Sequence, residues 1–166
     1  MTEETFGLLL DVAERVEHAV RSRDCPAIAA LEGERQLTLT DYDYLRDDDA
    51  AKEFELNAAA RGKQIGAIRW VIAVPQVWVI TSGEISTRAV SNHALRPGEE
   101  EAITWMSYDA SDGVDYGRIP YTRAPSGEPV FGEPETLAAK VWPEEQMPGY
   151  RLLRSLVTGD NSIGQD

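Results

Sequence analysis

The spacing of apolar residues changes near residue 66, and this change limits what the chain can fold into. In the first helical stretch, apolar residues recur every three or four positions, which is typical of one face of an amphipathic helix. These residues are Phe6, Leu9, Ala13, Val16 and Val20. After the change, β-branched and aromatic residues dominate 68–74 and 77–80, which favours strands. Helices followed by strands with short turns predict an α+β domain with an antiparallel meander sheet.

Three helical stretches are expected before the sheet. Thr2 is a suitable cap for the first helix. A short second helix is expected after a cap at Asp24 or Cys25, with a proline in its first turn and a stop at Gly33. Thr40 and Asp43 have the spacing of a capping box and predict the start of a third. The three aspartates at 47–49 favour a break in it, with Asp49 as the cap of a continuation that ends at Gly62. We expect these N-terminal helices to pack on one face of the sheet.

The strands are expected to be separated by short turns. Residues 36–40 alternate and predict a short strand ahead of the main sheet. Pro75 interrupts the long apolar stretch, which predicts either one strand with a bulge or two strands joined tightly. Residues 111–113 favour a hairpin turn. A short C-terminal helix should close a single domain at 1–159, and 160–166 should form a flexible tail.

Charge excludes several classes of partner. The chain has 29 Asp and Glu against 16 Lys and Arg, a formal charge of -13. Such a surface repels nucleic acid and anionic membranes, and attracts basic proteins. No apolar stretch is long enough for a membrane span, and the N-terminus lacks the basic region of a secretory signal. A single cysteine excludes an internal disulfide, so we expect a cytoplasmic protein of undetermined oligomeric state.

No motif in the sequence assigns a catalytic residue, a metal or a cofactor. The carboxylates from Asp41 onward do not match a calcium-binding loop, because Lys52 stands where the bidentate glutamate belongs. Cys25, at the expected helix start, has only His18 and His93 as conceivable bases. We therefore expect Cys25 to be structural.

Three functions remain open. The first is an acidic interaction module of inhibitor, immunity or adaptor type, which binds a basic protein through two acidic runs. These runs are Asp47, Asp48, Asp49, Glu99, Glu100 and Glu101. The second is a cone-shaped α+β domain that binds or converts a small molecule in a pocket. Its candidate residues are His93, Tyr108, Asp109, Trp70, Trp78 and Trp105. The third is a structural subunit of a bacterial or phage assembly.

Overall fold

The structure is a computed structural model that describes residues 1–81, 84–90, 94–137 and 147–157. The described residues form helices and strands in the following order. The elements are α1 (Glu3–Arg21), β1 (Ala27–Glu32), β2 (Gln36–Asp41), α2 (Asp48–Ile65), β3 (Arg69–Thr81), β4 (Glu84–Ala89), β5 (Glu99–Asp109), β6 (Gly113–Arg123), β7 (Pro129–Phe131), β8 (Glu135–Thr136) and α3 (Tyr150–Leu156).

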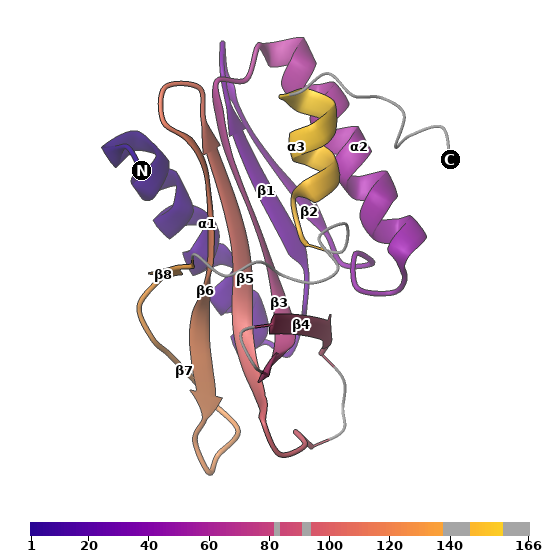
Figure 1. Cartoon of the computed structure of the whole chain (residues 1–166), viewed down its shortest axis with the longest axis vertical. Helices are drawn as coiled ribbons and strands as arrows, with labels where there is room; N and C mark the ends of the chain where they lie inside the picture. Colours follow the sequence, from indigo (N-terminus) through magenta and orange to yellow (C-terminus); the bar gives the residue numbers. More distant parts are fainter. Residues whose placement is uncertain (82–83, 91–93, 138–146, 158–166) are drawn as a thin grey trace.

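All the described strands belong to one curled antiparallel sheet. Its order is β2-β1-β3-β5-β6-β7, while β4 pairs with the second half of β3 and β8 pairs with β6. Helix α1 lies against one face, and α2 and α3 lie against the other (Figure 1). The predicted α+β class, the antiparallel sheet and the short C-terminal helix are thus confirmed.

The expectation that the helices cover only one face is wrong. The central strand β3 is apolar on both faces, because Val71 and Ala73 belong to the core under α1 while Trp70 and Ile72 belong to the core under α2. All four side chains are fully buried. A strand with two apolar faces must be covered on both, so the helices divide between them.

Helix α1 begins where the sequence predicts it. The Thr2 hydroxyl accepts a hydrogen bond from the Thr5 backbone N–H at 3.2 Å. The buried face, however, does not include Phe6, which is 45% exposed. It is centred on Leu8, Leu9 and the residues one and two turns later, so the prediction of a buried Phe6 is wrong.

Residues 27–32 form a strand, and the predicted short helix from Cys25 to Gly33 is wrong. Strand β1 lies between β2 and β3 and pairs antiparallel with both. Its first five residues are all buried, since both faces are covered. Alanines lack the β-branching that marks a strand, so the tertiary position overrides the local preference. The strand predicted at 36–40 is confirmed as β2.

Helix α2 starts later than the capping box at Thr40 and Asp43 predicts. The Asp41 carboxylate accepts a hydrogen bond from the Asp43 N–H at 2.9 Å, which forms a turn. The actual N-cap is Asp47, whose side chain accepts from the Ala50 N–H at 2.7 Å. The helix ends at Gly66, which has the left-handed φ of 61° that glycine favours.

Strand β3 is continuous through Pro75. The Ala110 N–H donates to the Ile68 carbonyl at 2.9 Å, so this carbonyl points toward β5 and the N–H of Arg69, in the same peptide group, points away from it. Backbone groups alternate along a strand, so the nitrogen of Pro75 points to the other side. On that side, pairing with β1 stops at Ala73 and pairing with β4 starts at Gln76. Pro75 therefore occupies a gap where no strand needs its missing N–H.

The hairpin predicted at 111–113 is confirmed. It joins β5 to β6, and Gly113 has a φ of 87° that suits glycine. Strand β5 begins with the three glutamates at 99–101. Alternation along the strand then directs Glu99 and Glu101 to the face on which α1 lies, and Glu100 to the opposite face.

Candidate functional site

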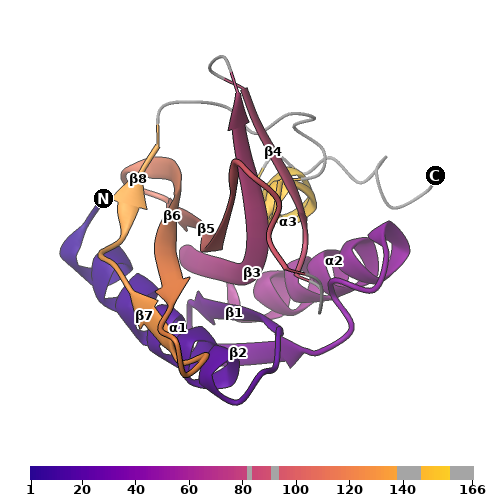
Figure 2. The ribbon, with the colours of Figure 1, turned by 90° about the horizontal axis from the view of Figure 1, so that it is seen from below.

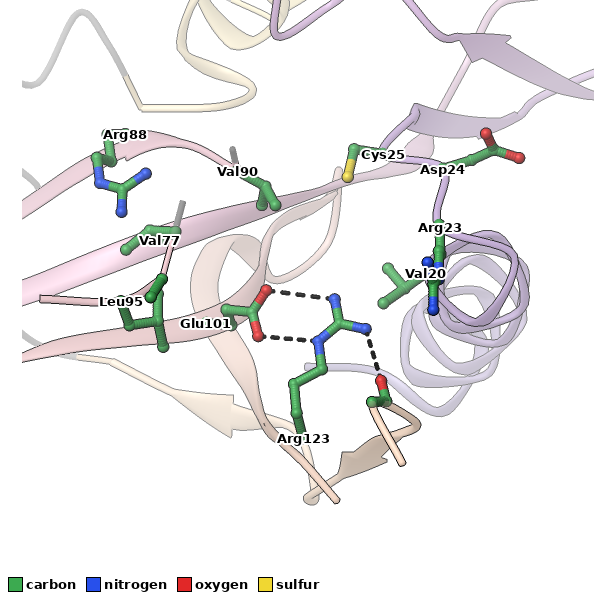
Figure 3. Close-up of a pocket in the computed structure, with 12 residues that line it drawn as sticks. Val20, Arg23, Asp24, Cys25, Val77, Arg88, Val90, Leu95, Glu101 and Arg123 are labelled. Carbon is green, nitrogen blue, oxygen red and sulfur yellow. Dashed lines mark hydrogen bonds and ion pairs between the residues drawn. The ribbon is translucent and has the colours of Figure 1, made fainter. Parts of the chain in front are cut away.

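A cavity of about 770 Å³ lies beyond the C-terminal end of α1. Its walls come from the end of α1 and the loop that follows it, from β3, from β4 and the residues after it, and from β5 and the end of β6. Figure 3 shows Arg123 and Glu101 facing one another, with Cys25 and Arg23 nearby. The cavity is open to solvent. A cavity of this size is typical of small-molecule binding sites.

Two of the arginines in this cavity are held by glutamates of β5. The Arg123 guanidinium donates to both oxygens of Glu101, at 3.1 and 3.3 Å, and to the Gly127 carbonyl at 3.1 Å. The Arg88 guanidinium likewise donates to both oxygens of Glu99, at 2.8 and 2.9 Å. Such bidentate pairs fix the geometry of all four side chains and reduce the net charge of the cavity.

Glu99 is held strongly in its ionised form. The hydrogen bonds from Arg88, together with one from the Arg96 N–H at 2.7 Å, lower the pKa of Glu99 to about 2. Ionisation of Glu99 is therefore part of the folded structure over the physiological range. A carboxylate in this state cannot act as a general acid, because it carries no proton to give.

Cys25 and Tyr121 do not supply a nucleophile or a proton donor near neutral pH. Cys25 precedes a strand, and no helix starts at this residue. Burial raises the pKa of its thiol. Burial, and next the charge of Glu101, also raise the pKa of Tyr121. The Tyr121 hydroxyl is buried without a hydrogen-bond partner among the described residues. Both groups are neutral at physiological pH, so the arrangement does not activate either one.

Arg23 is the unusual residue of the cavity. Its φ is 64°, and no other described residue except glycine has a positive φ. It follows the C-cap of α1, where glycine is the common residue, and its N–H donates to the Val20 carbonyl at 3.0 Å. A non-glycine residue in this conformation is strained. The side chain lines the cavity.

The residues predicted for a pocket do not gather around one cavity. Trp70 and Trp78 are buried under α2, whereas Trp105 is buried under α1 on the opposite face. Tyr108 stacks on Trp70 at 5.8 Å between ring centroids. His93 lies outside the described residues. These aromatic side chains fill the core, and the Trp78 indole N–H donates to the Thr104 hydroxyl at 2.8 Å.

Asp109 serves as an anchor between α1 and the sheet. Its carboxylate accepts from the side chain and the backbone N–H of Ser111, at 2.6 and 2.8 Å. It also accepts from the hydroxyls of Thr5 and Thr2, at 2.8 and 3.0 Å, and from Arg69 at 3.3 Å. The hydrogen bonds from Ser111, followed by those from the threonines, lower the pKa of Asp109. Every contact of this carboxylate is structural.

A second buried carboxylate, Glu55, was not predicted from the sequence. It is fully buried on α2 and accepts from the Tyr44 hydroxyl at 2.6 Å. It also accepts from the backbone N–H groups of Arg151 and Leu152, at 3.1 Å each. Burial raises its pKa. Glu55 thus attaches α3 to α2. Nothing in the local sequence of α2 indicates that this glutamate is buried, since its burial depends on the packing of α3.

The two acidic runs proposed for partner binding lie in different surroundings. Glu100 and Glu101 pair with Arg118 and Arg123 of the neighbouring strand β6, and Glu99 pairs with Arg88 of β4, which lies on the other side of β3. In the other run, Asp47 caps α2 and contacts Arg46, Asp48 pairs with Arg151, and Asp49 lies exposed in the first turn of the helix. The arginines of the cavity were missed because their pairing depends on strand neighbours.

Two further grooves border β2. One, of about 640 Å³, lies between α1 and β2, and the other, of about 480 Å³, lies between β2 and α2. Figure 2 shows β2 between these two helices. The two grooves are lined by six carboxylates and three guanidiniums. They are Asp11, Glu14, Asp24, Asp41, Asp43 and Glu53, with Arg15, Arg21 and Arg46.

Comparisons of this chain with protein-family models, with curated proteins and with solved structures return no match. In the described part of the chain, no group of three or more His, Cys, Asp or Glu has the arrangement of a metal site. None of its helices combines the length and apolar character needed to cross a membrane.

Proposed function

We propose that this protein is an acidic interaction module, of inhibitor, immunity or adaptor type, that binds a basic protein partner in the cytoplasm. The observation that carries the proposal is the excess of carboxylates in the two grooves that border β2. Complementary charge of this kind speeds the encounter with a partner and disfavours wrong partners.

The state of the buried titratable groups supports the same proposal. Glu55 and Asp109 are fully engaged in internal hydrogen bonds that join helices to the rest of the fold. Glu99 and Glu101 are paired with arginines. Catalysis by acids and bases needs a titratable group that is near its pKa and within reach of a substrate. In this protein these four carboxylates hold helices and strands together.

The proposal is tested with two double variants of equal net charge. In Glu14→Lys with Glu53→Lys, one exposed charge is reversed in each groove beside β2. In the control, Glu84→Lys with Glu128→Lys, two exposed charges are reversed away from β2. Proteins of the native host are captured on each immobilised variant at about 50 mM and about 500 mM salt, since screening weakens charge-driven binding.

We expect the wild-type protein and the control to retain the same basic partner at low salt. We expect about tenfold less of it on the groove variant, and also on the wild type at high salt. Equal retention on all three proteins at both salt concentrations would contradict the proposal.

The cavity at Arg123 favours a second candidate function, the binding of a small anion. Arg23 supports this candidate, because residues with a strained backbone conformation cluster at functional sites. Here Arg23 places a guanidinium at the wall of a cavity of about 770 Å³. The ligand class that suits it is a small carboxylate or phosphate, which arginine binds with two parallel hydrogen bonds.

Arg23→Gly tests this candidate. Glycine removes the strain of the positive φ, but it also increases the conformational entropy of the unfolded chain. We therefore expect the free energy of unfolding to rise by only about 0.5 kcal/mol. We also expect binding of citrate or inorganic phosphate, measured by calorimetric titration, to weaken about tenfold because one charged contact is lost. Unaltered binding in the variant, or none by the wild type, would remove this candidate and leave the first proposal intact.

A further inference from the structure

Strand β2 ends the sheet on one side, because β1 is its only strand neighbour among the described residues. The pairing of β1 with β2 is regular over six residue pairs, from Ala27 with Asp41 to Glu32 with Gln36. A regular edge strand presents a row of backbone donors and acceptors that no strand satisfies.

The hydrogen bonds show which residues of β2 point outward. The Gly33 N–H donates to the Arg35 carbonyl at 3.0 Å, which makes these residues a hydrogen-bonded pair that continues the β1–β2 register. Backbone groups alternate in direction along a strand. Leu37, Leu39 and Asp41 therefore point their backbone groups to β1. The outward-pointing residues are Gln36, Thr38 and Thr40.

This edge lacks the features that usually protect one. Natural edges are shortened, bulged, or interrupted by proline and lysine. Strand β2 contains none of these residues and no bulge. On the opposite side, β7 has only three residues and begins with Pro129. Strand β4, whose described partner is β3, carries Arg88 into the cavity, and an inward-pointing charge is also protective.

The grooves on both sides of β2 suit the side chains of an added strand. Side chains of an extended segment alternate between the two faces of a sheet. The two grooves flank the C-terminal end of β2, at residues 39–41. A strand added to β2 would therefore direct alternate side chains at this end toward the groove beside α1 and the groove beside α2. Lysine or arginine in such a strand would meet Glu14 and Asp24 on one side and Asp43 and Glu53 on the other.

We propose that β2 binds its partner by strand addition, so that an extended basic segment of the partner becomes the next strand of the sheet. This inference rests on the function proposed above, and it adds the docking surface and the mode of binding. Backbone bonds to Gln36, Thr38 and Thr40 would give affinity, and the flanking carboxylates would select basic side chains. A second copy of this chain would bring the same carboxylates together, which repel one another.

Thr38→Pro and Thr38→Val make the matched test. Proline removes one outward N–H without removing a hydrogen bond to β1, whereas valine keeps the N–H and suits a strand. The probe is a ten-residue peptide of alternating lysine and threonine, with an alternating glutamate and threonine peptide as control. Binding is measured from amide chemical shifts, and the slowing of hydrogen exchange is followed at residues 36, 38 and 40.

We expect the wild-type protein to bind the lysine peptide with a dissociation constant of about 1 mM or tighter, and not the glutamate peptide. Thr38→Val should bind within about twofold of wild type, and Thr38→Pro at least about tenfold more weakly. If Thr38→Pro does not fold, the wild type is tested with a lysine peptide that is N-methylated at alternate residues. N-methylation removes the backbone donors of the peptide, so this peptide should also bind at least about tenfold more weakly.

Strand addition is overturned if Thr38→Pro binds as well as Thr38→Val, if the N-methylated peptide binds normally, or if the wild type does not bind the lysine peptide. A dimer of the free protein that disappears in Thr38→Pro would assign the edge to a second copy instead. Normal binding by Thr38→Pro together with weak binding by Glu14→Lys with Glu53→Lys would keep the charge-based function and reject only the strand.

Discussion

Glu55 shows how one buried carboxylate holds two helices together. Its three hydrogen bonds come from Tyr44 and from the first residues of α3. Glu55→Ala would leave two backbone N–H groups buried without an acceptor and would also open a cavity. We expect the free energy of unfolding to fall by about 3 kcal/mol or more. Glu55→Gln keeps an acceptor for the N–H groups and should cost less, as urea denaturation of both variants would measure.

The loss of unfolding free energy caused by Glu55→Gln should also depend on pH. Burial raises the pKa of Glu55 above its usual 4.5, so the folded protein binds this proton more tightly than the unfolded chain does. The stability that Glu55 contributes is complete below the unfolded pKa and is lost as the pH rises through the folded pKa. The cost of Glu55→Gln should therefore be larger at a pH of about 4 than at about 7. An equal cost at both pH values would mean that Glu55 does not titrate differently in the folded state.

At the scale of the element, the sequence predicts best where a helix or strand has one buried face. Helix α1 is such an element, and its cap at Thr2 was predicted correctly. Strand β1 is buried on both faces, so its apolar residues show no period that separates a strand from a helix. The pairing with β2 and β3, which no local pattern contains, decides its conformation.

The candidate sites show the same dependence on pairing. The run at 99–101 reads as an acidic patch in the sequence, yet strand alternation and the arginines of β4 and β6 neutralise it in the fold. Nor does the sequence indicate that β2 is an edge, because strand order follows from tertiary packing. The acidic character of the N-terminal residues was visible from composition alone, whereas its arrangement on both sides of β2 was not.

At the scale of the whole molecule, the formal charge of -13 predicts that added salt stabilises the folded protein but weakens its binding to a partner. Mutual repulsion among the surplus carboxylates destabilises the compact state, and salt screens this repulsion. The surface ion pairs are also screened, but such pairs contribute little stability each. Thermal unfolding midpoints should therefore rise by about 2–4 °C between about 20 mM and 500 mM sodium chloride. Capture of the partner should weaken over the same range.

The variant Glu14→Lys with Glu53→Lys provides the control for this prediction. Each substitution replaces a negative charge with a positive one, so the formal charge changes from -13 to -9. Repulsion is smaller in this variant, and its midpoint should rise less with salt than that of the wild type. A midpoint that falls with salt in the wild type would mean that the ion pairs of Arg69, Arg88 and Arg123 outweigh the repulsion. In that case the stability lost by screening the ion pairs would exceed the stability gained by screening the repulsion among the carboxylates.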